Sequence, residues 1–358
     1  MYRFDNCDGK KTGSIAIYGA QMVAVSVYYA LKATYPSCHV ESFVVNSLEG
    51  NPLSIDGIPV IPLREWPLVD IPFVIAVSEN FHEDIVRELE KKGIKNWFCI
   101  DSKTEVILME RFYSTLGKLE CLHLLEKGEK KASLSVYMSK FHKDCPLKGK
   151  YQLPAWIYPI QVGAALTDAC VAALRDDEGD NISAKNVNYS ELTGMYWVGK
   201  HADSDYLGLF HYRRILDVTE EDLYRIAGND VDAILPYPTM HYPNIYEHHK
   251  RYLKESDWDT MLQALRECAP DYLDMLPKIF EDKYFYNYNM FIAKKSVFRD
   301  YCNWLFPILS RVEELSTPKG WERADRYIGY LGENLTTLYF MANRKGLKIA
   351  HTGRLMLT

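Results

Sequence analysis

The chain has 358 residues and a formal net charge of −6. Coating nucleic acid requires a clear excess of Lys and Arg, so a protein with that main task, and nucleic acid as a partner, are excluded. Hydrophobic residues make up 47% and charged residues 25%, which excludes a disordered or fibrous chain and is typical of a globular protein. At this length we expect two domains of unequal size.

The cysteines and the N-terminus indicate the compartment. None of the eight cysteines forms a CxxC pair, which predicts neither a zinc site nor a disulfide framework. The first residues, MYRFDNCDGKK, lack the apolar segment of a signal peptide, and no run of 18 apolar residues follows. We therefore expect a cytoplasmic protein. The apolar run 304–309, with Arg299 and Arg311 nearby, suggests either peripheral contact with the inner face of the membrane or core packing.

The first hundred residues alternate strand-like and helix-like segments. An apolar run over 14–18 ends at Gly19, and residues 22–31 carry apolar side chains at helical spacing. This alternation predicts a small Rossmann-like domain with a parallel sheet over residues 1–102. Its further elements are strands at 40–45, 58–62, 73–77 and 97–100 and a helix over 81–92.

The same alternation raises the alternative of an NAD-dependent sugar epimerase or dehydrogenase. The dinucleotide fingerprint G-x-G-x-x-G reads Gly19, Gln21 and Ala24 at its three positions. Only the first glycine is present, and the Gln21 side chain would crowd the pyrophosphate. This departure disfavours nicotinamide binding.

Residues 103–131 are charged and helical in pattern, which predicts a connector. A second α/β alternation begins with a strand over 134–138 and extends through 132–358.

Within it the segment YLGLFHYRR is an apolar strand over 206–210 followed by a basic end. Ligands of open α/β sheets bind outside the carboxyl ends of strands, and paired guanidinium groups match phosphate oxygens. We expect His211, Arg213 and Arg214 to form an anion clamp there. The alternative is that these residues form ion pairs with nearby acids.

Three further segments carry candidate residues. DDEGDNISAKN places Asp176, Asp177 and Asp180 close together, where they would repel one another unless solvated or paired with a cation such as Mn²⁺ or Mg²⁺; a helix-capping loop is the alternative. No cofactor is required by the sequence. In YFYNYNMFI, a strand over 284–292 would present Asn287 and Asn289 on one face, beside Tyr288, for sugar hydroxyls.

The segment RADRYIGYLGENLTTLY is helix-like over 323–339. Glu333 lies among apolar neighbours, where burial would raise the pKa of its carboxyl and suit it as a base, although it could instead pair with Arg326. Asp325 is the second candidate for the base.

The second part of the chain resembles the HYRR-containing family of bacterial capsule, exopolysaccharide and O-antigen gene clusters. The resemblance rests on six segments in this order: NIS, KN, ELTGMYW, YLGLFHYRR, YNMFI and GYLGE. The resemblance covers roughly 132–357 and implies a glycosyltransferase A-like α/β domain, with the first domain as an accessory module. In that fold a strand ends in an Asp-x-Asp that holds a metal on the diphosphate. Here the strand ends in the basic HYRR segment, so we expect arginines to replace the metal.

The resemblance implies a hexosyltransferase that uses a nucleotide-sugar donor, with UDP-galactofuranose a candidate, and a glycan or lipid-linked oligosaccharide acceptor. Donor contacts are expected from the HYRR residues and from Lys185, Asn186, Asn181 and Asp180; acceptor or sugar contacts from Asn287, Asn289, Tyr288 and Arg326. A helix over 189–200 ends in Lys200-His201, where the family usually has Lys-Asn. A non-catalytic sugar-nucleotide-binding regulator is the other alternative.

Overall fold

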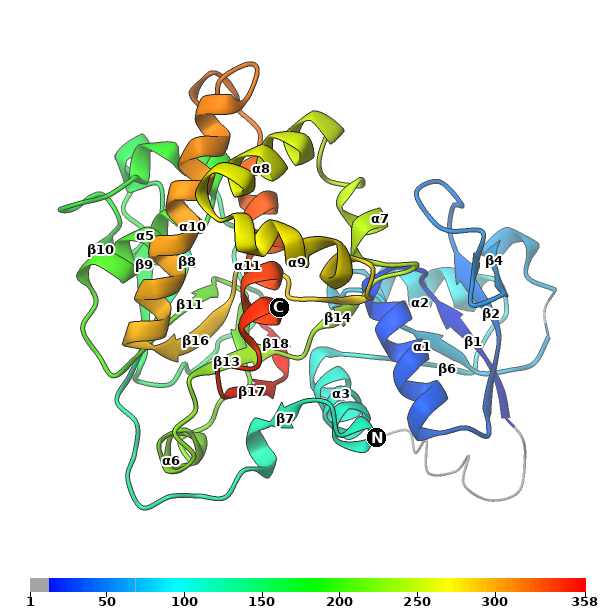
Figure 1. The fold of residues 1–358 in the computed structure, drawn as a ribbon. Coiled ribbons are helices and arrows are strands. Elements are labelled where there is room, and N and C mark those ends of the chain that lie inside the picture. Colours follow the sequence, from blue (N-terminus) through cyan, green and yellow to red (C-terminus); the bar gives the residue numbers. More distant parts are fainter. Residues whose placement is uncertain (1–12, 68) are drawn as a thin grey trace.

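The computed structural model describes residues 13–67 and 69–358 (Figure 1). Cys7 and the N-terminal segment used to predict the absence of a signal peptide lie outside the described residues. The described chain forms an α/β fold in which helices pack on two largely parallel sheets. This confirms the predicted fold class.

The first sheet joins β3 (Ser54–Ile55), β4 (Ile58–Pro62), β2 (Cys38–Val45), β1 (Gly13–Tyr18), β5 (Phe73–Ile75) and β6 (Trp97–Cys99), in that spatial order. All pairs are parallel except the β3–β4 hairpin. Its connecting helices are α1 (Met22–Thr34), α2 (His82–Lys91) and α3 (Ser102–Leu116). The alternation of apolar runs predicted the other five strands and the helices α1 and α2, but not the short strand β3.

The second sheet has the order β10 (Leu174–Arg175), β9 (Ile157–Gln161), β8 (Leu134–Lys140), β11 (Tyr206–His211), β16 (Phe291–Lys294), β13 (Ala233–Pro236), β17 (Ile349–Thr352) and β7 (Glu120–Cys121). Only β16 runs antiparallel to its neighbours. The carboxyl ends of β8, β11 and β13 thus share one edge with the amino end of β16. A short extension, β12 (Arg214–Leu216) and β18 (Arg354–Met356), continues from β11.

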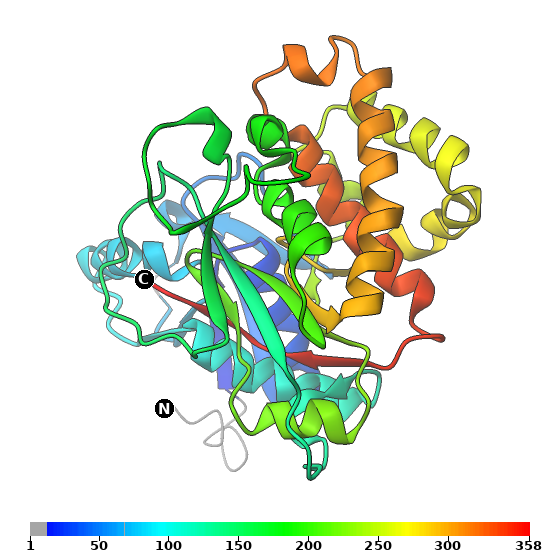
Figure 2. The same cartoon turned by 90° about the vertical axis from the view of Figure 1, so that its left-hand side faces the viewer.

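Helices cover this sheet, and α10 and α11 lie side by side in both views (Figures 1 and 2). Tyr301 on α10 and Phe340 on α11 are fully buried, and each contacts Phe291 of β16. The helices of this part are α4 (Asn186–Tyr189), α5 (Leu192–His201), α6 (Asp222–Gly228), α7 (Ile245–His249), α8 (Glu255–Cys268), α9 (Pro270–Phe280), α10 (Lys295–Leu315) and α11 (Tyr327–Asn343). Minor elements are the strands β14 (Thr239–Met240) and β15 (Tyr284–Phe285) and 3-10 turns at Leu63–Glu65, Glu79–Phe81, Leu122–Leu124, Ala164–Leu166, Ser183–Lys185 and Gly320–Glu322.

The apolar run 304–309 contributes to this core. Leu305, Ile308 and Leu309 of α10 are fully buried, as the packing alternative for this segment expected. Among the described residues, no helix is long and apolar enough to cross a membrane.

The two sheets are joined by direct contacts. On α3, Tyr113 stacks on Tyr237 at 5.4 Å and donates a hydrogen bond to the Pro238 carbonyl at 2.8 Å. Ser26 of α1 accepts a hydrogen bond from the Met240 amide at 2.9 Å. The division into domains 1–102 and 132–358 with a connector over 103–131 stays a prediction.

One predicted element was wrong and another, the helix confirmed over Leu192–His201, begins later than predicted, because the backbone turns within each. The expected strand 284–292 is split, since Tyr288 and Asn289 have φ angles of 74° and 49° and form a turn between β15 and β16. Asn tolerates this left-handed conformation better than most residues, and the turn removes the alternation expected of Asn287 and Asn289. The expected helix 189–200 breaks at Ser190, where φ is 52°, into α4 and α5.

Gly208 allows β11 to fit between its neighbours, and this yields a prediction. A Cβ at Gly208 would lie 2.8 Å from Ile292 Cγ1 and 2.9 Å from the Phe291 carbonyl oxygen. We expect Gly208→Ala to lower the free energy of unfolding by about 1–3 kcal/mol, the usual cost of overpacking, in urea titrations. Gly346→Ala is the control, since its Cβ would meet only the Asn343 carbonyl at 3.8 Å; equal effects of both variants would contradict the prediction.

Candidate functional site

The candidate site lies at the carboxyl end of β11. Residues 206–210 are buried within the sheet, and His211 pairs with Arg214 across a tight turn into β12. Tyr212 and Arg213 form the turn between β11 and β12, and both are partly buried. The Tyr288–Asn289 turn lies at the same edge because it precedes the antiparallel strand β16. The strand order therefore brings the basic end of β11 next to this turn.

Basic side chains gather around two tyrosine rings at this edge. The guanidinium carbons of Arg214 and Arg354 lie 4.4 Å and 4.8 Å from the centre of the Tyr288 ring. Arg213 lies 5.5 Å from the centre of the Tyr212 ring, and its buried Nε has no hydrogen-bond partner. Burial lowers the pKa of Arg214, and the adjacent Arg354 and Arg213 lower it further.

Carboxylates do not neutralise this cluster by direct pairing. Among the described residues, no Asp or Glu forms a salt bridge with Arg213, Arg214 or Arg354. The alternative of a strand end paired with its own acids is therefore not what the structure shows. The arrangement can bind a multiply charged anion, because planar guanidinium groups bind phosphate oxygens in pairs.

The carboxyl group of Glu333 on α11 lies close enough to Arg214 for the two charges to interact. Glu333 is partly buried. Burial raises the pKa of Glu333 from 4.5 to about 8, and repulsion by Glu191 adds to the rise, whereas Arg326 and Arg214 oppose it. A carboxyl group with this pKa exchanges a proton near neutral pH and can serve as a general base.

A hydrogen-bonded network connects β11, the Tyr288–Asn289 turn, Glu191 and α11. The His211 Nε2 lies 2.7 Å from the Tyr288 carbonyl oxygen, so it is assigned as the protonated nitrogen that donates. Asn289 donates to Glu191 Oε1 at 2.8 Å and to the Gly329 carbonyl at 3.2 Å, and Thr336 donates to Asn289 Oδ1 at 3.0 Å. Burial lowers the pKa of His211, which favours its neutral form.

This network changes the interpretation of the two predicted asparagines. Asn289 is fully buried, with 0% of its surface exposed, and its amide is occupied by protein partners, so it holds the site together and offers no surface to a sugar. Asn287 lies apart, where it accepts a hydrogen bond from Thr239 and contacts the Met22 sulfur at 3.6 Å. The predicted shared sugar-binding face is therefore absent.

Arg326 and Asp325, the two other candidates next to the start of α11, have different surroundings. Arg326 is exposed, donates to Ser190 Oγ at 2.7 Å and lies 3.6 Å from Glu191, which places it at the rim of the site. Asp325 is exposed and forms two contacts with Arg323, at 3.1 and 2.7 Å. Because Asp325 is paired and exposed, Glu333 is the better candidate for a base.

The three aspartates of the acidic segment do not converge. Asp176 is fully buried and accepts from the Gly163 and Ala164 amides at 3.0 Å. Asp177 forms a two-point contact with Arg175, and Asp180 accepts from the Tyr196 hydroxyl at 2.9 Å. No group of three or more His, Cys, Asp or Glu side chains among the described residues is placed to hold a metal. These aspartates therefore do not fit a shared metal site.

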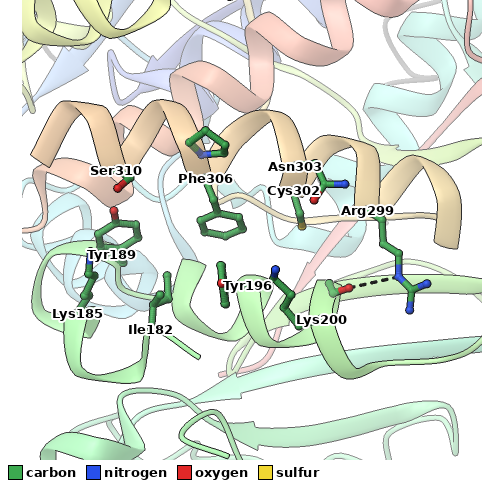
Figure 3. A pocket seen from close by; sticks show the side chains of 12 residues that line it. Ile182, Lys185, Tyr189, Tyr196, Lys200, Arg299, Cys302, Asn303, Phe306 and Ser310 are labelled. Carbon is green, nitrogen blue, oxygen red and sulfur yellow. Dashed lines mark hydrogen bonds between the residues drawn. The ribbon is translucent and has the colours of Figure 1, made fainter. Parts of the chain in front are cut away.

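Of the remaining donor candidates, Lys185 lines a cavity between α5 and α10 (Figure 3). The cavity has a volume of about 410 Å³, and Lys185, Tyr196, Lys200 and Phe306 are among its lining residues. Lys185 is paired with the buried Glu313 at 2.5 Å. The cavity lining contains no residue of the His211–Arg214 segment, so Lys185 belongs to a separate place.

Asn181 and Asn186 stabilise the backbone near that cavity. The Asn181 side chain donates to the Gly179 carbonyl at 2.8 Å and accepts from the Ser183 amide at 3.1 Å. Asn186 is buried and donates to the Ser190 carbonyl at 2.7 Å and Thr193 Oγ1 at 3.0 Å. Their predicted contacts with a donor would require these bonds to be replaced.

The nucleotide-binding alternative in the first sheet is also clarified. A Cβ at Gly19, where φ is 118°, would lie 2.7 Å from the Ala76 carbonyl oxygen. This glycine is therefore required by packing between β1 and β5. Gln21 stands at the position of the second fingerprint glycine. Its side chain donates to the Gly50 carbonyl at 2.9 Å and to Asn51, so this position is filled by a side chain.

The structure thus brings together six predicted residues, and it adds two that sequence reasoning missed. The predicted group is His211, Arg213, Arg214, Tyr288, Arg326 and Glu333. The missed residues are Glu191, a carboxylate directly before the apolar start of α5, and Arg354, the only charged side chain in the final segment TGRLMLT. A charge in otherwise apolar sequence was the available signal for both.

Comparisons with known proteins bear on the family and the fold of the chain. The model of the family described as a domain of unknown function (DUF4422) matches residues 136–344. The chain is similar to the apo structure of WbbM, a bifunctional glycosyltransferase, with 28% sequence identity and a TM-score of 0.54. The match covers 63% of this chain and 45% of that one, so it spans less than half of WbbM. No curated protein matches the chain.

The raised pKa of Glu333 predicts a pH-dependent stability. Its proton is held more tightly in the folded protein, so the stabilisation is fully present below about pH 4.5 and is lost as pH rises through about 8. We expect Glu333→Gln, which cannot ionise, to gain in melting temperature over the wild type as the pH is raised from 5 to 9. Thermal unfolding followed by circular dichroism checks this. A difference that stays constant over this range would contradict it.

Proposed function

The chain belongs to the DUF4422 family, and we propose that it is a glycosyltransferase that transfers a sugar from a nucleotide-diphosphate donor. The acceptor would be a glycan or a lipid-linked oligosaccharide in the synthesis of bacterial capsule, exopolysaccharide or O-antigen, with a UDP-sugar as donor and UDP-galactofuranose as a candidate. The similarity to a bifunctional glycosyltransferase supports the reaction class. The geometry of the β11 edge supports the residue roles.

One observation carries the proposal: a basic cluster without carboxylate partners faces a carboxyl group of raised pKa. Arg214 and Glu333 lie close enough that each affects the pKa of the other. Glycosyl transfer from a nucleotide sugar requires both functions, because the departing nucleoside diphosphate carries negative charge and the acceptor hydroxyl must lose a proton.

In the proposed inverting reaction, the acceptor oxygen attacks the anomeric carbon as the bond from that carbon to the diphosphate oxygen breaks. The hydroxyl proton passes to the Glu333 carboxylate, and the electron pair of the broken bond leaves with the nucleoside diphosphate. Arg213 and Arg214 stabilise the charge of that leaving group. The products are a glycoside and a free nucleoside diphosphate.

The neighbouring groups position these residues. His211 holds the Tyr288 carbonyl, and the Tyr288 ring lies against the guanidinium group of Arg214. Arg326 at the rim would contact the acceptor or the donor sugar. A divalent metal, when present, would neutralise the diphosphate; because the acidic segment is committed to protein contacts, we propose that the arginines do so.

Removal of the two arginines tests the donor site. We expect Arg213→Ala/Arg214→Ala to lower kcat/KM at least about 100-fold, as loss of transition-state charge stabilisation commonly does. Nucleotide release from a panel of nucleotide sugars, with and without chelator, measures this. Arg87→Ala is the control, since Arg87 is exposed on α2 and pairs with Asp84. Unchanged turnover of the double variant would remove the arginines from the mechanism.

The pH profile tests the base. Because only the ionised carboxyl can accept a proton, we expect kcat/KM, which reports the free enzyme, to rise with pH through about 8, the pKa of Glu333. Glu333→Gln should lose this limb and most of the turnover while still binding the nucleotide. If the wild type itself binds nucleotide sugars and releases no nucleotide, the protein is a non-catalytic sugar-nucleotide-binding regulator.

A further inference from the structure

Arg354 occupies a defined place beside the β11 edge. It begins β18, where its backbone pairs with Leu216 of β12. The preceding Gly353 packs against Val106 of α3, and the Met356 amide donates to Ser102 Oγ at 3.0 Å. Arg354 is thus positioned by the backbone of the second sheet and by a helix that follows the first sheet.

The side chain of Arg354 shares an aromatic ring with Arg214. The two guanidinium carbons lie within 4.8 Å of the Tyr288 ring centre. Cations are attracted to the face of an aromatic ring, so Tyr288 offers partial compensation to two charges. The proximity still has a cost, because Arg354 and Arg213 both lower the pKa of Arg214.

Glu105 of α3 lies close enough to Arg354 for their charges to interact. Burial raises the pKa of Glu105, while Arg354 lowers it, and both residues line a small cavity with Ser26. Arg354 acts on Glu105 through its charge, without a hydrogen bond between the two side chains. Arg354 therefore keeps a guanidinium group with donors to spare beside Arg213 and Arg214.

We infer that Arg354 binds the diphosphate of the donor together with Arg213 and Arg214, an inference that rests on the proposed function. A diphosphate presents two phosphate groups, and each can accept a two-point contact from one guanidinium group. A third arginine, beyond the two of the HYRR segment, adds donors for the remaining non-bridging oxygens and further positive charge beside the diphosphate. An anion of this charge also relieves the repulsion within the cluster.

The role of Arg354 would connect the first sheet to donor binding. Because α3 contacts the backbone on both sides of Arg354, the position of α3 determines where the guanidinium group of Arg354 lies. Glu105 on the same helix competes with the diphosphate for this charge. Glu105→Gln should therefore tighten diphosphate binding in the wild type and have no such effect when Arg354 is absent.

The experiment is isothermal titration calorimetry of the full chain with inorganic pyrophosphate and with UDP, GDP and dTDP. We expect Arg354→Ala to weaken pyrophosphate and nucleoside diphosphate binding roughly 10- to 100-fold, the value of a hydrogen bond to a charged group. Arg354→Lys should be intermediate, since it keeps the charge and loses the planar fork. Arg311→Ala is the matched control, because Arg311 on α10 pairs with Glu267 and Glu314.

The outcomes separate this inference from the proposed function. If the wild type binds these ligands and Arg354→Ala binds them equally well, Arg354 is not a donor residue and the proposed function stands. If the wild type binds neither pyrophosphate nor any of the nucleoside diphosphates, the donor site itself is overturned. Should Arg354→Ala fail to fold, Arg354→Lys decides: affinity equal to that of the wild type would contradict the inference.

Discussion

The amide of Asn289 is the contact on which the arrangement of the site depends. It links the Glu191 carboxylate before α5 to Gly329 and Thr336 on α11, in a fully buried position. A buried polar network of this kind is stable only when its members are satisfied. Because Asn289 is the second residue of a left-handed turn, the same contact fixes Tyr288, whose ring meets the arginines and whose carbonyl meets His211.

The network also places two carboxyl groups, Glu191 and Glu333, close together. Their repulsion would be costly if both were ionised in a partly buried place. Asn289 and Arg326 lie against Glu191, and repulsion by Glu191 adds to burial in raising the pKa of Glu333. The contacts that fix the position of Glu191 therefore bear directly on the pKa of Glu333.

Sequence patterns predicted the parts of the fold that depend on local chemistry. Alternating apolar runs located the strands of the first sheet, and the apolar run before His211 located β11 with its basic end at the ligand-binding edge. Glu333 was identified from its apolar neighbours, and the structure gives the raised pKa expected of it. These predictions succeeded because burial and strand position can be inferred from neighbouring residues.

Long-range contacts explain what the sequence could not predict. Asn289 was predicted to lie in a strand and face a ligand. Its real partner, Glu191, lies 98 residues away in the sequence, and the left-handed turn has no strong local signature, so neither could be predicted. Asp176 belonged to an acidic run typical of a metal site, yet the Gly163 and Ala164 amides occupy its carboxylate. Arg354 reaches the site through the pairing of β18 with β12, a contact between segments more than a hundred residues apart.

The opposing charges at the β11 edge link donor binding to base strength. Arg214 and Arg326 lower the pKa of Glu333 against the effect of burial. A bound diphosphate would cancel part of the positive charge at Arg214, so the pKa of Glu333 would rise and its carboxylate would hold an acceptor proton more strongly. Departure of the nucleoside diphosphate would reverse this effect and favour release of the proton. The same guanidinium group would then stabilise the leaving group and set the basicity of Glu333 during turnover.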